Sequence, residues 1–295
     1  MLPVYLAVAL SAALWLYVIY RNDKFEPEPV RTLIRVAIQG AIFSGLPSAF
    51  FNSAAAIALN VTDKIYSTNP PGSVSDMLSF ALFVGFNEEF FKAMAAIYIL
   101  RKLDDFNEPV DAIIYSMTVA LGFAAFENIE YTVAGGVELL LVRSFTAVPL
   151  HLGLASIWGT GIAMAKYYRK GGYFLNVLPY IIPAALLHAA YNFYLFLNPG
   201  NPFSTLIAVL FAFATINFAS RRLRYFLNKS PFKNARICPM CLTKNNFFDK
   251  YCKNCGSYLV SDFLNTCPNC GTKNKAWASF CRKCGETCES CGFNQ

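Results

Sequence analysis

The chain has 295 residues and a formal net charge of +7, and 56% of its residues are hydrophobic while only 15% are charged. A soluble domain has fewer apolar and more charged residues, so this composition argues against a soluble enzyme and predicts an integral membrane protein. All ten cysteines lie between Cys238 and Cys291, whereas the long apolar runs end before residue 220. We therefore predict an all-α polytopic membrane domain over residues 1–220, a basic linker over 221–236 and a Cys-rich module over 237–295.

Seven apolar runs are long enough to cross a bilayer as helices, which takes about 20 residues each. They cover roughly 2–20, 33–59, 77–100, 110–134, 144–167, 173–197 and 203–219. The first run lacks the basic start and the small-residue cleavage site of a signal peptide, so we expect it to be retained. The second run is the least regular, because it is interrupted by Arg35, Gln39, Pro47 and Asn52.

Lys and Arg are distributed unevenly between the two ends of these runs. One side has little besides Lys64 and Arg143, and the other has Arg21, Lys24, Arg31, Arg101, Lys102, Lys166, Arg169, Lys170 and the RRLR of 221–224. Because cytoplasmic loops are enriched in Lys and Arg, this pattern predicts an N-terminus outside and a C-terminal module in the cytoplasm. Thiols stay reduced in the cytosol and remain available to bind a metal.

The C-terminal module contains the same cysteine pattern twice, as CPMC…CKNC in 238–255 and CPNC…CRKC in 267–284. Each CxxC unit offers two thiolates, and two units close one tetrahedral zinc site that cross-links a module with little core of its own. The spacing favours two structural zinc ions over disulfides, with the ligands Cys238, Cys241, Cys252 and Cys255, and Cys267, Cys270, Cys281 and Cys284. A fifth unit, CESC at 288–291, fits a truncated repeat, half of a site completed by another chain, or two free thiols.

The charges of this module do not form a basic run. Lys and Arg are mixed with Asp and Glu, so binding of nucleic acid is less favoured. We expect instead that the zinc ribbons bind a cytoplasmic protein partner or regulate the membrane domain.

Ionisable residues lie inside the apolar runs, where each is costly unless it faces a bundle interior or a cavity. The third, fourth, fifth and sixth runs contain, in order, Glu88, Glu89 and Lys92; Glu127; His151; and His188 with Asn192. Counted inward from the outer ends of the runs, Glu88, Glu127 and both histidines lie about 10–17 Å deep at 1.5 Å per residue. We therefore expect these four side chains to share one layer in the outer half of the membrane.

Three pairs in this set are four residues apart and so share a helix face, namely Glu88 and Lys92, Phe123 and Glu127, and His188 and Asn192. Taken singly, Glu88 with Lys92 would also serve as a structural ion pair, and each histidine as a hydrogen-bonding link between helices. We expect Glu89 to neutralise the lysine or to position another group. The common depth favours a joint chemical role.

The order EExxK, FxxxE, a histidine on the next run and then HxxxN resembles the PrsW family of intramembrane proteases, which are relatives of the CAAX-processing membrane proteases. The matching residues lie within 77–197 and are Glu88, Glu89, Lys92, Phe123, Glu127, His151, His188 and Asn192. The CAAX pattern differs, with EExxxR and FxxxH, so neither its substrate nor its metal-free mechanism transfers directly. The resemblance implies hydrolysis of a peptide bond and does not extend to the zinc ribbons.

Two forms of chemistry remain open for these residues. In the first, Glu88 takes a proton from water, while His151, His188 and Asn192 hold the water or stabilise the oxyanion. In the second, His151, His188 and either Glu127 or Glu88 bind an additional divalent metal, and the other glutamate acts as the base.

Two other classes of function also use buried Glu, Lys and His. A proton-coupled transporter would need them, but the runs show no internal repeat and the acidic groups cluster at one depth. A non-catalytic scaffold would recruit its partners through the zinc ribbons. We expect an intramembrane endopeptidase that cuts a membrane-associated protein near the extracytoplasmic face.

Overall fold

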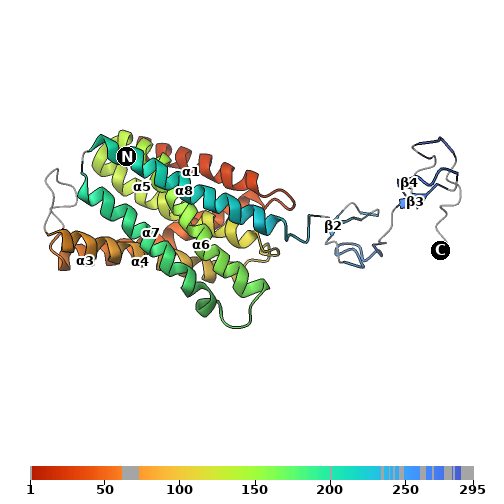
Figure 1. The fold of residues 1–295 in the computed structure, drawn as a ribbon, viewed down its shortest axis with the longest axis horizontal. Coiled ribbons are helices and arrows are strands. Elements are labelled where there is room, and N and C mark those ends of the chain that lie inside the picture. Colours follow the sequence, from red (N-terminus) through yellow and green to blue (C-terminus); the bar gives the residue numbers. More distant parts are fainter. Residues whose placement is uncertain are drawn as a thin grey trace. The chain divides into compact units, whose positions relative to one another are not determined.

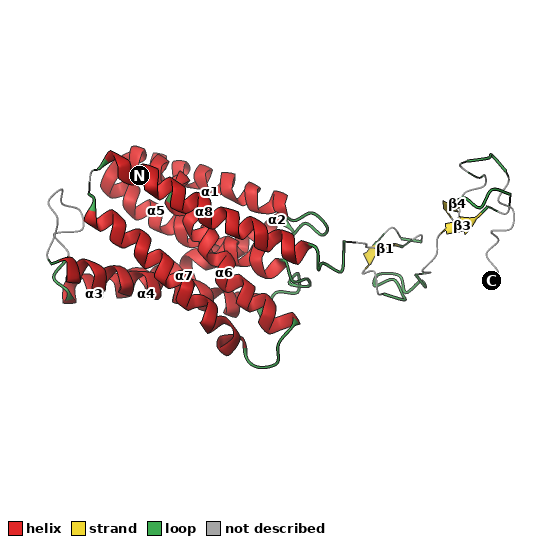
Figure 2. Cartoon of the chain, in the orientation of Figure 1, coloured by secondary structure: helices red, strands yellow, loops and turns green. Residues whose placement is uncertain are grey.

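The structure is a computed structural model, and it describes residues 2–61, 73–199, 201–233, 236–238, 240, 241, 243–245, 249–259, 264–267, 269–275, 281 and 283–286. The chain forms two compact units, Met1–Ser230 and Pro231–Gln295. Figure 2 shows that the described helices belong to the first unit and that the regular elements described in the second are short strands. Lys64 and the Cys288/Cys291 pair of the sequence analysis lie outside the described residues.

The first unit is a bundle of helices that lie side by side (Figure 1). Its elements are α1 (Leu2–Asn22), α2 (Val30–Gly40), the π-helical segment η1 (Ala41–Gly45), α3 (Leu46–Ala58), α4 (Val74–Leu100), α5 (Asp111–Phe145), α6 (Ala147–Tyr167), α7 (Tyr173–Leu197) and α8 (Pro202–Leu227). Each predicted apolar run falls on a helix, and the second run corresponds to the continuous stretch α2, η1 and α3. The all-α prediction is thus confirmed.

The bundle has the surface of a multi-pass membrane protein. Five helical stretches of the described residues are long and apolar enough to span a bilayer, and one of them, Asp111–Tyr167, contains both α5 and α6. α4 is equally long but carries three ionisable residues in its middle. Large apolar side chains such as Leu10 and Phe50 remain 72% and 69% exposed, as expected for groups that face lipid.

The core of the bundle is built on α5 and α6. α6 packs against α5, α7 and α8, and α4 packs against α7. Nearly every residue of α6 from Ala147 to Ala163 is buried, as is every residue of α5 from Asp111 to Ala124. Because α4, α5, α6 and α7 all meet around this core, polar residues on their inner faces are brought together.

The polar interruptions of the second run are accommodated by a change of helix type. The backbone passes from α2 into one π-helical turn, where the Ser44 hydroxyl donates to the Gly40 carbonyl at 2.6 Å. Pro47 follows as the second residue of α3, directly after this π-helical turn. Such π turns occur frequently at functional sites, and here the following turns bring Ser48 and Asn52 to the wall of a cavity.

The segment between the fourth and fifth runs is helical, although the sequence indicated a connecting loop. α5 continues to Phe145, with a break at Gly136, whose φ of 77° lies in the left-handed region that glycine adopts readily. Beyond the break the chain returns, so that Arg143 reaches Asn128 with an Nε to Oδ1 distance of 2.8 Å. A straight helix would separate these two residues by about 22 Å.

The second unit consists of two small antiparallel ribbons. β1 (Arg236–Ile237) pairs with β2 (Lys244–Asn245), and β3 (Leu264–Thr266) pairs with β4 (Lys273–Lys275). α8 runs to Leu227, so the first residues of the predicted basic linker, 221–227, are helical.

Candidate active site

A cavity of about 860 Å³ opens among α3, α4, α5, α6, α7 and α8. Its wall is mainly apolar, and it includes the polar side chains Ser48, Asn52, Glu88, Glu127, His151, His188 and Asn192. Glu89 and Lys92, both 0% exposed, lie behind this wall in contact with the histidines. The structure therefore gathers all seven predicted site residues of the membrane domain in one place.

Glu88 is a buried carboxylate at the wall of the cavity. Its Oε1 accepts a hydrogen bond from the Asn52 side chain at 3.0 Å, and Asn52 is in turn held by Asn87 at 2.8 Å. Its Oε2 lies 3.5 Å from the Lys92 ammonium and 3.7 Å from Nε2 of His188, and has no hydrogen-bond partner among the described residues. One oxygen of Glu88 is thus fixed, and the other is available to a ligand.

Glu89 is the main partner of the buried lysine. Its Oε1 lies 2.6 Å from Nζ of Lys92 and 3.0 Å from Nδ1 of His188, and its Oε2 accepts from the Trp158 indole at 2.9 Å. We expected Glu89 to neutralise the lysine or to position another group, and the contact with Lys92 is present. Lys92 is closer to Glu89 than to Glu88, so its electrostatic interaction with Glu88 is the weaker of the two.

His151 connects the lysine to the second acidic residue. Its Nδ1 lies 3.0 Å from Nζ of Lys92, and its Nε2 lies 3.1 Å from Oε2 of Glu127. Glu127 also accepts from the Arg143 guanidinium at 2.5 Å. The rings of His151 and His188 meet edge to face, with centroids 5.1 Å apart. One contact network therefore joins four residues from four helices: Lys92, Glu127, His151 and His188.

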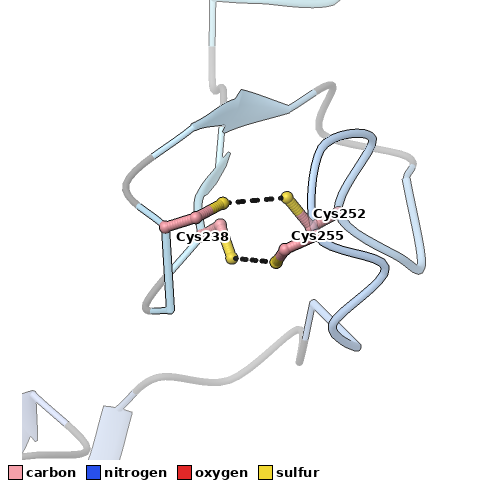
Figure 3. A group of neighbouring side chains, drawn as sticks. Cys238, Cys252 and Cys255 are labelled. Atoms are coloured by element: carbon pink, nitrogen blue, oxygen red, sulfur yellow. Dashed lines mark hydrogen bonds between the residues drawn. The ribbon is translucent and has the colours of Figure 1, made fainter.

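The cysteines of the C-terminal module form two further sites. In the first, Sγ of Cys238 lies 3.6 Å from Sγ of Cys255, and Sγ of Cys241 lies 3.5 Å from Sγ of Cys252 (Figure 3). The second repeats this arrangement with Cys267, Cys270, Cys281 and Cys284. Disulfide sulfurs are about 2.05 Å apart. A tetrahedral zinc site with bonds of about 2.3 Å has sulfur–sulfur edges of about 3.8 Å. Both groups therefore match zinc sites.

Comparison with known proteins agrees with both parts of the chain. A model of the PrsW family, described as an intramembrane metalloprotease family, matches residues 28–217. The chain belongs to the PrsW family. It is an intramembrane protease whose membrane domain is followed by a double zinc ribbon, since a model of that module matches residues 238–285. The family match extends well beyond the 77–197 over which the sequence motifs carry the resemblance.

Curated PrsW proteins are similar over most of the membrane domain. Protease PrsW of Oceanobacillus iheyensis is 31% identical over 188 residues, which cover 64% of this chain and 80% of that protein. Protease PrsW of Geobacillus kaustophilus is also 31% identical over 188 residues, covering 64% and 77%. Protease PrsW of Bacillus subtilis is 29% identical over 177 residues, covering 60% and 75%. No solved structure matches the chain.

Four residues of this PrsW site were absent from the sequence prediction. Asn52 was noted only as an interruption of an apolar run, and Arg143 only as a charge on the outer side. Asn87 and Trp158 carried no signal, because an amide beside two glutamates and one indole in an apolar helix are both ordinary. Arg143 could have been suspected, since it is the only lysine or arginine between Lys102 and Lys166.

The PrsW residues around the cavity fit a divalent metal. Glu88, His151 and His188 each offer one ligand atom, and these atoms lie within 4.8 Å of one another. Each imidazole has a carboxylate at one nitrogen, Glu127 for His151 and Glu89 for His188, which orients the ring. In His188 this leaves the lone pair on Nε2, whereas Nδ1 of His151 also contacts the Lys92 ammonium at 3.0 Å, so a metal bound to His151 would replace one of its two contacts. The site also has three carboxylates against the two cations Lys92 and Arg143, so a further positive charge is accommodated.

Close contact between α4 and α7 sets the position of His188. A Cβ on Gly85 would lie 2.6 Å from the Ala185 carbonyl oxygen and 2.7 Å from the Ala189 nitrogen, both backbone atoms of α7. Helices approach this closely only where one of them carries a small residue. Gly85 therefore allows α7 to deliver His188 within 3.0 Å of Glu89.

Gly85→Ala is expected to lower proteolysis by about tenfold to a hundredfold, because a displacement of about 1 Å in a catalytic arrangement has effects of that size. The measurement is the initial rate of substrate cleavage together with the thermal unfolding temperature. Gly172→Ala is the matched control, since a Cβ there meets nothing within 4 Å. Equal rates for the two variants would contradict this account of the α4–α7 contact.

Proposed function

We propose that this chain is a metal-dependent intramembrane endopeptidase that cuts a membrane-associated protein near the extracytoplasmic face. The supporting observation is the convergence of Glu88, His151 and His188, whose ligand atoms lie within 4.8 Å of one another beside an apolar cavity. The apolar wall suits a hydrophobic peptide segment, and the polar side chains of the same wall allow water near the carbonyl. Family membership favours this activity over a transporter.

In this proposal Glu88, His151 and His188 hold the metal, and Glu89 and Glu127 orient the two rings. A divalent metal held by these residues would supply Lewis-acid chemistry, namely polarisation of the scissile carbonyl and easier deprotonation of water. Glu127 is then the remaining carboxylate at the cavity and accepts the water proton, while Arg143 and His151 hold it in place. Asn192, on the wall one turn beyond His188, is a candidate donor to the oxyanion.

Lys92 has a positioning role in the same scheme. It is fully buried, its Nζ contacts both Glu89 and His151, and it lies 4.1 Å from the centroid of the Phe123 ring. These contacts fix the carboxylate that orients His188 and the ring of His151. The lysine thus acts through its neighbours and does not reach the substrate.

Metal content separates this form from metal-free glutamate chemistry. We expect three zinc ions per full-length chain, two in the ribbons and one in the membrane domain, measured by elemental analysis of purified protein. Deletion of residues 235–295 should leave one zinc, and His188→Ala in the full-length chain should leave two. Two zinc ions in the full-length chain and none after the deletion would favour the metal-free form.

We also propose that the N-terminus lies outside and the zinc ribbons in the cytoplasm, where they bind a protein partner. The contacts support this, because loops next to the Lys and Arg clusters meet at one end of the bundle: Thr32 donates to Asp105, and Lys166 donates to the Phe106 carbonyl. Protease added to intact cells should leave residues 231–295 uncut. If the ribbons bind a protein partner, the variant that lacks residues 235–295 should no longer capture that partner. The same variant, once purified, should still cleave its substrate.

A further inference from the structure

Three buried carboxylates lie together at a second place in the bundle, and we call them the acidic triad. Asp23 and Glu28 come from the loop between α1 and α2, and Asp111 is the first residue of α5; they are 4%, 6% and 0% exposed. Each offers one oxygen, and these oxygens lie within 4.8 Å of one another. Asp111 and Glu127 are 16 positions apart on α5, about 24 Å along the helix, so the triad is separate from the proteolytic site.

Hydrogen bonds fix one oxygen of each carboxylate. Oδ2 of Asp23 accepts from the backbone of Glu28 at 3.1 Å, and Oδ2 of Asp111 accepts from the backbones of Asn107 and Glu108 at 2.8 and 2.7 Å. Oε2 of Glu28 accepts from the Tyr115 hydroxyl. The other oxygens of Asp23 and Asp111 are buried and have no hydrogen-bond partner among the described residues. Buried oxygens of this kind ordinarily have a partner, so they point to a ligand.

The surrounding charges do not compensate the triad. The titratable groups that face it are Glu26 on the α1–α2 loop, Asp105 and Glu108 on the α4–α5 loop, Tyr115 on α5, and Lys166 and Tyr167 on α6. Lys166 is the single cation in this set, and its ammonium is already engaged by the Phe106 carbonyl and the Phe106 ring. Burial raises the pKa of Asp23 to about 6, of Glu28 to about 8 and of Glu108 to about 7.

We propose that the acidic triad binds one hard divalent cation such as Mg²⁺, held by one oxygen each of Asp23, Glu28 and Asp111. All the ligand atoms are carboxylate oxygens, and such sites prefer Mg²⁺, Ca²⁺ or Mn²⁺ to zinc. The cation joins the α1–α2 loop to the beginning of α5, the helix that carries Glu127. It is therefore a structural clamp at the end of the bundle distant from the proteolytic site.

The carboxyl groups of the triad make the stability of the folded chain depend on pH. A raised carboxyl pKa means that the folded chain holds these protons more tightly than the unfolded chain, so without a cation the cluster favours folding at low pH and loses this contribution as the pH rises towards 8. A cation competes with these protons for the carboxylate oxygens.

Tb³⁺ luminescence tests the proposal on the full-length protein with its zinc retained, because Tyr115 beside Glu28 can sensitise a bound Tb³⁺. We expect saturable emission that excess Mg²⁺ displaces, and an increase of the thermal unfolding temperature on addition of Mg²⁺. Asp111→Asn should weaken Tb³⁺ binding at least tenfold and abolish the Mg²⁺ shift. Its amide oxygen can still accept the two backbone hydrogen bonds, so the variant should fold and unfold at a temperature no lower than that of the cation-free protein.

Asp104→Asn is the matched control, since Asp104 is exposed on the α4–α5 loop, and it should bind Tb³⁺ as the unchanged chain does. Emission that survives Asp111→Asn but disappears in Glu88→Gln would assign the ion to the proteolytic site and overturn the proposal. Absence of both the emission and the Mg²⁺ shift at pH 8 would overturn it as well, and would assign shared protons to the triad instead.

Discussion

Glu88→Gln is expected to abolish cleavage of a single-span membrane substrate by the purified protein, with a loss of about 10²- to 10⁴-fold or more. Glutamine keeps the size of the side chain and can still accept from Asn52. It removes the negative charge of Oε2, which has no hydrogen-bond partner in the described part of the chain, and with it the ability to hold a metal or take a proton. The rate of substrate cleavage in detergent or proteoliposomes measures the effect.

Glu138→Gln is the control for this variant, because Glu138 is exposed beyond the Gly136 break and takes no part in the cavity wall. It should cleave at the rate of the unchanged protein. Unimpaired cleavage by Glu88→Gln would remove Glu88 from the mechanism in both its metal-dependent and its metal-free form. Metal analysis of the same variant tells these forms apart, since only a ligand role lowers the zinc content.

Lys92→Met should both inactivate the protein and destabilise it by about 3–5 kcal/mol, the usual cost of removing one partner of a buried ion pair. Glu89 would keep its hydrogen bonds from Trp158 and His188 but would lose the full positive charge of Lys92 at 2.6 Å. Methionine fills a similar volume, so the loss reports on charge more than on packing. Thermal unfolding of the purified variant and its rate of cleavage are the two measurements.

The double variant Lys92→Met/Glu89→Gln shows where the destabilisation comes from. Removal of both charges means that Glu89 is no longer an isolated ion, so part of the stability should return, although Glu88 still lacks the lysine that lies 3.5 Å from its Oε2. Activity should not return, because His188 would lose the carboxylate that orients it. Equal instability of the single and the double variant would mean that the ion pair is not what makes Lys92 important.

Much of the helical fold is predictable from the sequence, because spans of apolar residues have few alternatives to helix in a bilayer. Two features of the helical fold are not predictable in this way. The π-helical turn before Pro47 and the return of the chain after Gly136 each arise where one residue changes the backbone path. No run of hydropathy values records such a change, and Arg143 was therefore assigned to a loop.

The common depth of the polar residues predicts that they lie together in the candidate site. It does not predict which carboxylate pairs with Lys92. Glu88 and Glu89 are four and three residues before Lys92, and both spacings allow contact on one helix. The choice of Glu89 depends on Trp158 and His188, which come from α6 and α7. The acidic triad was missed for a related reason, since Asp23 and Glu28 lie in a loop, where sequence alone gives no sign of burial.

The contact between Lys92 and Glu89 has a bearing on how α4 enters the membrane. An ionised residue in the middle of a helix adds about 2.5–3.5 kcal/mol to the free energy of its insertion into the bilayer. Lys92 and Glu89 are three residues apart on one helix, so they can neutralise each other before any other helix has arrived. Of the three charges in the middle of α4, Glu88 alone then depends on later assembly, so membrane insertion of α4 does not have to wait for the helices that complete the site.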